Sequence, residues 1–125
     1  MSRENLKDIC TKYFETWGRK DIDGLAALFA NDIRLQDWER IEDGIYRVLN
    51  ANQQIFDSFI SINVEVIGLY QDPAIPNKVV CQLYIEFKLT DGGSTLHVGD
   101  STLHVTDIIT FNDEDKISMI WAYKG

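Results

Sequence analysis

Three polar side chains occupy positions at which the spacing of apolar residues calls for another apolar one. Tyr13 lies in the middle of an apolar stripe, Asp37 is in phase with the apolar residues of a short alternating segment, and Asp107 interrupts the apolar face of a longer one. Burial raises the pKa of a carboxyl group and favours its neutral form, which, like a phenol, donates a hydrogen bond. Tyr13 and Asp107 could therefore together hold a developing oxyanion. Asp37, at a wetter strand end, would stay ionised and could act as a general base.

Each of these residues also has a purely structural interpretation. A tyrosine on a core stripe usually packs, with its hydroxyl bonded to the backbone or to water. An aspartate at the end of a short strand usually caps a turn, and one within a long strand can sit at a bulge or pair with a lysine across an interface. The presence of three such residues on inward faces is what favours the chemical interpretation.

Apolar residues at three- and four-residue spacing predict helices in the first half of the chain. The first helix covers the first 17 residues, is capped by Ser2 and ends at Gly18 in a left-handed conformation. A second, shorter helix is capped by Asp21 and includes Phe29 on its inward face. A charged turn over residues 39–44 then precedes a third helix. The apolar stripe of that helix consists of Ile45, Leu49, Asn52, Phe56, Phe59 and Ile60.

After residue 61 the apolar period changes to two, which is typical of strands. One short strand, at residues 33–37, comes before the third helix. The later strands are predicted at residues 62–71 and 78–90, in a segment that ends at 111, and at 116–123. Asp91-Gly92-Gly93 indicates a hairpin turn, and the repeat of Ser-Thr-Leu-His-Val at 94–98 and 101–105 is interpreted as a duplication that lengthens a loop. The pattern predicts one α+β domain over residues 1–125, with helices on one face of a curved sheet.

Composition and charge narrow the classes of function. The chain of 125 residues is 45% hydrophobic and has a net charge of −8, which repels phosphate backbones and anionic lipids, so neither nucleic acid nor a membrane is an expected partner. Cys10 and Cys81 lie on apolar faces and are interpreted as buried thiols of a cytoplasmic protein. His97 and His104 have no matching ligand set, so no metal site is expected.

The predicted sheet is apolar on both faces, which indicates an association of two chains. Val80 and Tyr84 face away from Leu83, and Ile108 faces away from Ile109. Since helices can cover only one face, the other is expected to be covered by a second copy, in a homodimer.

Features near both ends of the chain have a familiar pattern. The first half contains the stretch Tyr13–Trp17, then residues 21–32 and Asp37. The last part contains the alternating segment 105–111, a polar turn and a last strand. These features resemble the ketosteroid isomerases and, more loosely, the SnoaL-like proteins of the nuclear transport factor 2-like superfamily. The resemblance implies a cone-shaped fold, in which three N-terminal helices close over a curved, mainly antiparallel sheet around a deep pocket.

The resemblance also implies roles for particular residues. Tyr13 matches the oxyanion-hole tyrosine of the isomerases, Asp37 matches their base, and Asp107 matches the protonated acid that completes the oxyanion hole. This chemistry requires no cofactor. Four further residues are expected to contact the substrate, namely Trp17, Trp38, Phe56 and Val105.

The chain departs from the isomerase pattern at the pocket. Trp38 stands where a proline usually follows the base, an amide near Asn50 replaces a supporting tyrosine, and Lys124 replaces an aromatic residue at the pocket edge. Three functions therefore stay open. The protein is an isomerase, or a related lyase, hydrolase or cyclase, that moves a proton next to the carbonyl of a small apolar compound; it is a non-catalytic pocket for a small hydrophobic ligand; or it is a protein-interaction module.

Overall fold

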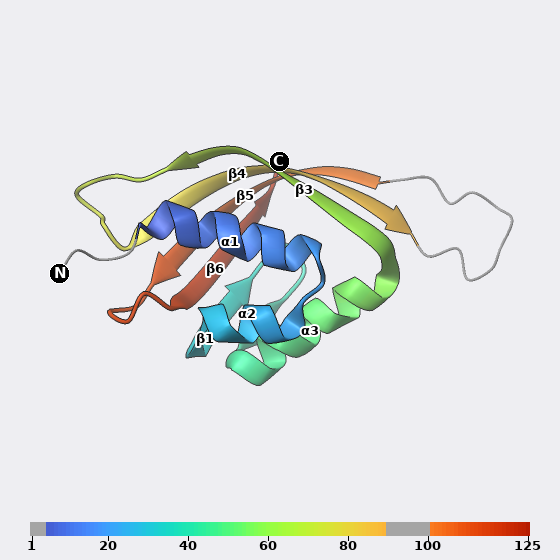
Figure 1. Cartoon of the computed structure of the whole chain (residues 1–125), viewed down its shortest axis with the longest axis horizontal. Coiled ribbons are helices and arrows are strands. Elements are labelled where there is room, and N and C mark those ends of the chain that lie inside the picture. Colours follow the sequence, from blue (N-terminus) through green and yellow to red (C-terminus); the bar gives the residue numbers. More distant parts are fainter. Residues whose placement is uncertain (1–4, 90–100) are drawn as a thin grey trace, which may run out of the picture.

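Residues 5–89 and 101–125 are described by the computed structural model, in which three helices lie on one side of a curved, six-stranded sheet (Figure 1). The helices are α1 (Leu6–Gly18), α2 (Ile22–Leu28) and α3 (Ile45–Ser58). The strands are β1 (Phe29–Gln36), β2 (Ile41–Asp43), β3 (Phe59–Tyr70), β4 (Lys78–Leu89), β5 (Ser101–Phe111) and β6 (Ile117–Lys124). This arrangement confirms the predicted α+β class.

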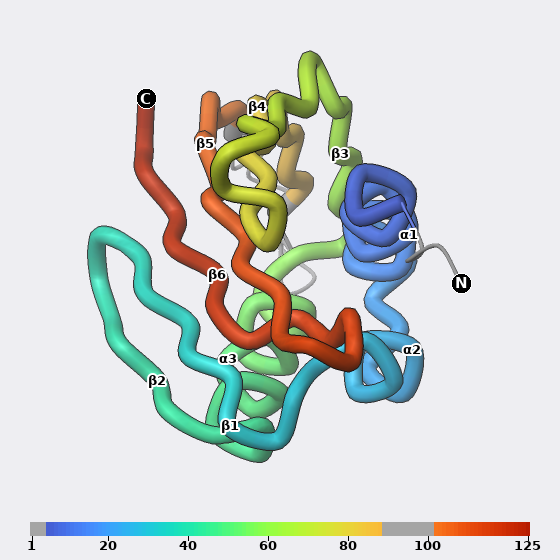
Figure 2. Tube along the Cα trace, turned by 90° about the vertical axis from the view of Figure 1, so that its left-hand side faces the viewer, coloured from blue at the N-terminus to red at the C-terminus, as the bar shows by residue number. Residues whose placement is uncertain are grey.

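The strands follow the spatial order β2-β1-β6-β5-β4-β3, which Figure 2 shows from the side. The pairs β3–β4, β4–β5 and β5–β6 are antiparallel, as the predicted meander requires. β1 joins the other edge of the meander by running parallel to β6, so that Leu35 pairs with Ile120. The first and last strands of the sequence are therefore neighbours, and the segment after β1 lies beside the C-terminal end of β6.

Both ends of α1 differ from the sequence prediction, whereas the start of α2 agrees with it. α1 is capped by Asn5, whose side chain accepts a hydrogen bond of 2.9 Å from the Lys7 amide, whereas Ser2 lies outside the described residues. Gly18 belongs to the helix, and the left-handed residue after it is Lys20, with φ of 58°. Asp21 caps α2 as predicted, because its Oδ1 accepts a hydrogen bond of 3.0 Å from the Gly24 amide.

The boundaries of several helices and strands differ from the prediction at places where the spacing of apolar residues changes from one period to another. Phe29, predicted in the second helix, begins β1, and the predicted turn at 39–44 contains the short strand β2. Phe59 and Ile60 continue the spacing of the α3 stripe but belong to β3, where Ile60 is 60% exposed. The buried face of α3 comprises Val48, Ala51, Asn52 and Phe56.

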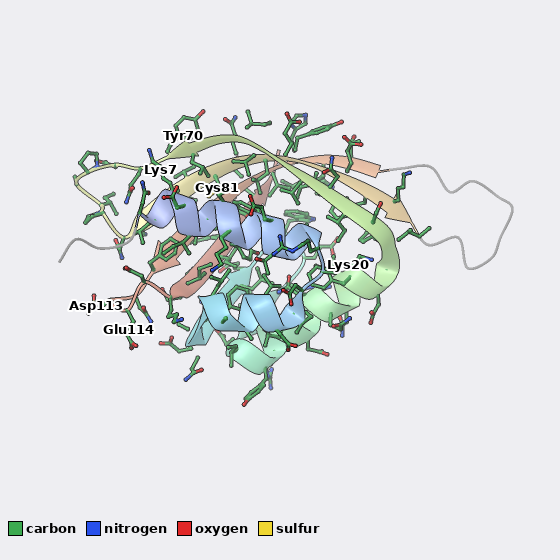
Figure 3. The ribbon with its side chains drawn as sticks, in the orientation of Figure 1. Lys7, Lys20, Tyr70, Cys81, Asp113 and Glu114 are labelled. Carbon is green, nitrogen blue, oxygen red and sulfur yellow. The ribbon has the colours of Figure 1, made fainter. Side chains whose placement is uncertain are left out.

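The core lies between the helices and the inner face of the sheet. Alternation along β4 and β5 directs one set of side chains inward, as predicted, and these are Val79, Cys81, Leu83, Ile85, Val105, Asp107 and Ile109. Cys81 lies between β4 and α1, and Figure 3 shows it there, while Tyr70 projects from the opposite side of the sheet. Both free thiols are buried.

Two further observations complete the fold. None of the described helices is long and apolar enough to cross a membrane. The predicted hairpin turn at 91–93 and the first copy of the repeat, which includes His97, lie outside the described residues, whereas the second copy is the start of β5.

Candidate functional site

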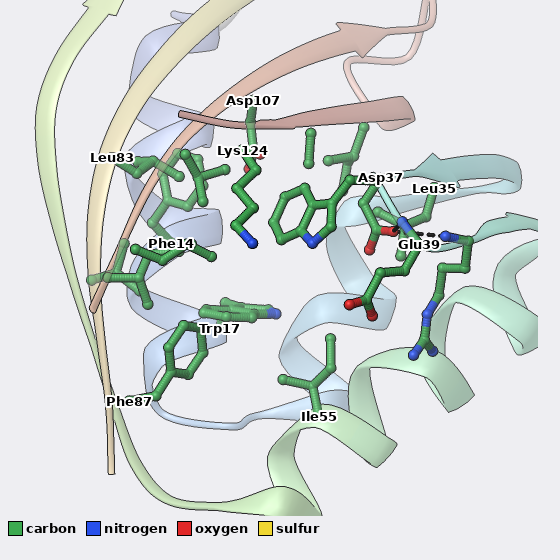
Figure 4. A pocket seen from close by; sticks show the side chains of 18 of the residues that line it. Phe14, Trp17, Leu35, Asp37, Glu39, Ile55, Leu83, Phe87, Asp107 and Lys124 are labelled. Carbon is green, nitrogen blue, oxygen red and sulfur yellow. Dashed lines mark hydrogen bonds between the residues drawn. The ribbon is translucent and has the colours of Figure 1, made fainter. Parts of the chain in front are cut away.

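A cavity of about 370 Å³ opens between the helices and the inner face of the sheet, and Figure 4 shows it from close by. Its volume is in the lower part of the range for sites that take small organic ligands. Most of its wall is apolar. The apolar lining includes Phe14, Trp17, Leu35, Ile55, Phe59, Val64, Leu83, Phe87, Leu103, Val105, Ile120 and Ala122.

The three predicted chemical residues all line this cavity. Tyr13 comes from the inward face of α1 and is 5% exposed, and Asp107 comes from β5 and is 6% exposed. Asp37 directly follows β1 and is partly buried. The sheet brings Asp37 and Asp107 together, because β1 pairs with β6 and β6 pairs with β5, whereas α1 contributes Tyr13.

Asp107 lines the cavity from β5, where it pairs with Cys81 on β4 and Ala122 on β6. Burial, and next the negative charge of Asp37, raise the pKa of Asp107 from 3.8 to about 7. Near neutral pH a large share of Asp107 is therefore a neutral acid, which donates one hydrogen bond. No other described residue forms a hydrogen bond with its carboxyl group, so this donor remains available to a ligand.

Tyr13 keeps its phenol proton for the same physical reason. Burial comes first, and the nearby Asp107 second, among the causes that raise the pKa of Tyr13 well above 10. Its ring packs against Phe14 and Phe29, with centroid distances of 5.0 and 6.0 Å, which fix its orientation from two sides. Tyr13 and Asp107 together provide two O–H donors in the same cavity.

Asp37 caps a turn and also lines the cavity. Its Oδ1 accepts hydrogen bonds of 2.7 Å from the Glu39 amide and 2.8 Å from the Arg40 amide, so it closes the turn between β1 and β2. No described residue donates to Oδ2. One oxygen therefore holds the carboxylate in place, while the other remains available to a ligand in the cavity.

The predicted wall residues divide into lining and supporting positions. Trp17, Trp38 and Val105 line the cavity, whereas Phe56 lies outside the lining and packs against Trp17, with ring centroids 5.8 Å apart. Phe87 contacts Trp17 from another side, at 6.3 Å. Trp17 is thus a wall that two other rings support.

The amide on the third helix that contacts the cavity wall is Asn52, which lies close to the exposed Asn50. Asn52 is 4% exposed, accepts a hydrogen bond of 2.8 Å from Trp17 Nε1 and donates one of 2.9 Å to the Val48 carbonyl. It supports Trp17. The signal was present in the sequence, because Asn52 is the polar member of an otherwise apolar helical stripe.

Sequence reasoning missed two charged residues of the site, Glu39 and Arg40. They lie in the turn between β1 and β2, where no periodicity indicates which side chains point inward. Lys124, which the resemblance placed at the pocket edge, does line the cavity. The described residues contain no group of three side chains arranged to hold a metal ion.

The model of the SnoaL-like domain family matches residues 10–120, which is most of the chain. The chain belongs to the SnoaL-like family. No curated protein matches it in sequence.

Solved structures of SnoaL-like and related proteins share the fold of this chain. A putative SnoaL-like polyketide cyclase from Shewanella denitrificans superimposes with a TM-score of 0.82 at 10% identity, over 98% of this chain and 92% of its own. An epoxide hydrolase from Mycobacterium tuberculosis, described as LEH-like, gives a TM-score of 0.78 at 11% identity, over 97% and 83%. A protein from Catenulispora acidiphila with a ketosteroid isomerase-like fold, solved in complex with trimethylamine, gives 0.77 at 14% identity, over 93% and 84%. These likenesses confirm the predicted cone-shaped fold.

Proposed function

We propose that this SnoaL-like protein binds a small apolar carbonyl compound and catalyses the transfer of a proton at the carbon next to the carbonyl. The observation that carries the proposal is the meeting of Asp37 with two O–H donors, Tyr13 and Asp107, in one apolar cavity. The similar structures carry names from several reaction classes, so they support the fold alone. We infer the reaction from the residues of this cavity.

The proposed reaction uses the three residues in sequence. The carbonyl oxygen of the ligand accepts hydrogen bonds from Tyr13 and Asp107, which draw electron density onto that oxygen. Asp37 Oδ2 takes the proton from the adjacent carbon, and an enolate forms with its charge on the held oxygen. Asp37 then returns the proton at another carbon of the conjugated system, so the net change is an isomerisation.

The apolar walls strengthen each step. A cavity that excludes water makes the two hydrogen bonds to the enolate oxygen stronger than they would be in solution. The Glu39 and Arg40 amides, which donate to Asp37 Oδ1, keep this base in one orientation.

A test of the proposal replaces Asp37 by asparagine. Asn keeps an oxygen that accepts from the Glu39 and Arg40 amides, so the turn and the fold should persist. With a β,γ-unsaturated cyclic ketone as substrate, we expect the rate of conjugated enone formation, followed by ultraviolet absorbance, to fall at least about 100-fold.

The matched control is Asp32→Asn, which removes the same charge from an exposed position on β1. We expect it to retain the wild-type rate. Full activity in the Asp37→Asn protein would remove Asp37 from the mechanism.

One observation favours a second candidate function, the binding of a small hydrophobic ligand without catalysis. Asp37 Oδ1 caps the turn between β1 and β2, which alone accounts for an aspartate at that position. This alternative predicts that the wild-type protein binds cyclic ketones, as followed by calorimetry, and converts none of them. Turnover that depends on Asp37 excludes it.

A further inference from the structure

Lys124 brings a positive charge to a cavity whose walls are mostly apolar. Along β6 the inward side chains are Ile120, Ala122 and Lys124, whereas Trp121 and Tyr123 are on the outer face. In the register of the sheet Lys124 pairs with Val105, and both line the cavity. The lysine is therefore fixed to the inner face by strand alternation, and not by chance of side-chain rotation.

Within residues 5–89 and 101–125, nothing pairs with the ammonium group of Lys124. Figure 4 shows the Lys124 side chain extending into the cavity toward Trp17, below Asp107. Lys124 forms no hydrogen bond or ion pair with any other residue that the structure describes. Lys124 is exposed at the end of β6, so its ammonium group stays hydrated while it lines the cavity, and it is available to pair with an anionic group of a ligand there.

The charged residues of the turn after β1 lie apart from Lys124. Asp37, Glu39 and Arg40 belong to the turn after β1, and Figure 4 shows Asp37 and Glu39 on the other side of the cavity from Lys124. At that turn the two carboxylates outnumber the one guanidinium group of Arg40, so the turn carries a net negative charge that repels an anion, whereas Lys124 attracts it. A ligand that carries one negative charge is thereby oriented with this charge at β6.

We propose that the ligand of this cavity is an apolar ketone that carries a carboxylate, and that Lys124 binds the carboxylate. This inference rests on the proposed function and specifies its substrate class. With the reacting carbon beside Asp37 and the carbonyl oxygen between Tyr13 and Asp107, the carboxylate lies on the side of the carbonyl opposite to the carbon that loses the proton. Lys124 acts in this reaction as a binding and specificity residue.

Isothermal titration calorimetry with two matched probes tests this proposal. The probes are α-tetralone, whose carbonyl is attached to the aromatic ring, with a carboxylate on that ring, and the same α-tetralone with a neutral carboxamide there. In both, the substituent lies across the carbonyl from the carbon that can lose a proton. We expect the wild-type protein to bind the carboxylate about three- to tenfold more tightly than the carboxamide, with a preference that weakens as salt is added.

Variants of Lys124 separate its charge from its bulk. In Lys124→Met the ratio of the two affinities should fall to about one, and in Lys124→Arg the preference for the carboxylate should persist. The control is Lys78→Met, which removes one positive charge from the same sheet at an exposed residue that does not line the cavity. That variant should keep the wild-type ratio.

The outcomes distinguish this inference from the proposed function. Equal affinities in the wild-type protein, or a preference that survives in Lys124→Met, overturn the role of Lys124 and leave the ketone site standing. Failure of both tetralones to bind overturns the ketone site and the role of Lys124 together.

Discussion

At the scale of single residues, the decisive feature is a carboxyl group that the sheet places where a charge is costly. Asp107 is 6% exposed between Cys81 and Ala122, and burial is the main cause that raises its pKa to about 7. The same burial that makes its ionised form unfavourable makes its neutral form a useful donor. Site chemistry and fold stability are therefore linked through one proton.

This link predicts how stability depends on pH. The folded protein binds the Asp107 proton more tightly than the unfolded chain does, so the contribution of Asp107 is most favourable below about pH 4. This contribution to the free energy of unfolding decreases as pH rises from the ordinary pKa of 3.8 to the folded value of about 7, and it does not decrease further above that pH. Between pH 5 and pH 8 the loss amounts to about 3 kcal/mol of the free energy of unfolding.

The variant Asp107→Asn keeps the shape and removes this proton. Urea unfolding at pH 5 and pH 8 should show a smaller decrease of the free energy of unfolding in the variant than in the wild-type protein. Asp113→Asn, which changes an exposed residue of the turn before β6, should follow the wild type. Identical pH dependence in wild type and Asp107→Asn would show that Asp107 has an ordinary pKa.

At the scale of elements, the site depends on a contact between two helices that are distant in sequence. Trp17 on α1 donates a hydrogen bond of 2.8 Å to Asn52 on α3, and Phe56 and Phe87 pack against the same indole. Because Trp17 lines the cavity, this contact determines where one cavity wall lies.

Removal of the Asn52 amide should both destabilise the protein and loosen that wall. In Asn52→Leu the Trp17 N–H loses its acceptor, so we expect the free energy of unfolding to fall by about 1–2 kcal/mol. Tryptophan fluorescence should change as well. In a Trp17→Phe background the same substitution should cost less, because the donor is already absent, and a double-mutant cycle measures the difference.

Asn50→Leu provides the matched control on the same helix. Asn50 is exposed, so its replacement should change the free energy of unfolding by less than about 0.5 kcal/mol. Equal costs for Asn52→Leu in the wild-type and Trp17→Phe backgrounds would contradict the proposed coupling of α1 and α3.

The sequence predicted most elements because most have a clear period. Alternation along β4 and β5 placed Asp107 on the inner face, and the three- and four-residue spacing of α1 placed Tyr13 there. Boundaries were missed where one period continues into the next, as at Phe29 and at the junction of α3 with β3. The left-handed position after α1 is taken by Lys20 and not by Gly18, because the helix extends through the glycine before the chain turns.

The rest of the site is formed by pairing between strands that are distant in the sequence, and such pairing cannot be recognised from the local pattern of residues. The parallel pairing of β1 with β6 brings the end of β1, and with it Asp37, to the cavity beside Asp107. Glu39 and Arg40 enter the lining from the turn after Asp37, where side-chain direction depends on the backbone of the turn. The inward positions of Tyr13, Asp37 and Asp107 and the resemblance both suggested a shared site, and the structure places the three residues in one cavity.

At the scale of the whole molecule, one face of the sheet remains uncovered by helices. Tyr70, Val80, Ile108 and Trp121 form a row across β3, β4, β5 and β6 on this outer face, where Tyr70 and Trp121 are 56% and 39% exposed. Trp121 stacks on Tyr123 with ring centroids 5.6 Å apart. This row of four residues is the surface on which we expect a second copy to pack.

We therefore predict a homodimer at micromolar concentration, measured as mass by light scattering. Trp121→Glu should convert it to a monomer, because the interface would then bury a charge without a partner. Tyr46→Glu on α3, at a residue that is 86% exposed and is not part of this row, should leave the mass unchanged. A monomeric mass for the wild-type protein would show that this outer face does not mediate self-association.

We propose above all that Asp37 removes a proton next to a carbonyl held by Tyr13 and Asp107. The most direct test is proton exchange at that carbon, measured by NMR on unsubstituted tetralone in deuterated buffer. Exchange reports the removal of the proton whether or not the compound is afterwards isomerised, and a neutral ketone makes the result independent of Lys124. We expect the wild-type protein to accelerate loss of the proton signal over buffer, and Asp37→Asn to lower this acceleration at least about 100-fold. Exchange no faster than in buffer, or equal in wild type and Asp37→Asn, would contradict this proposal.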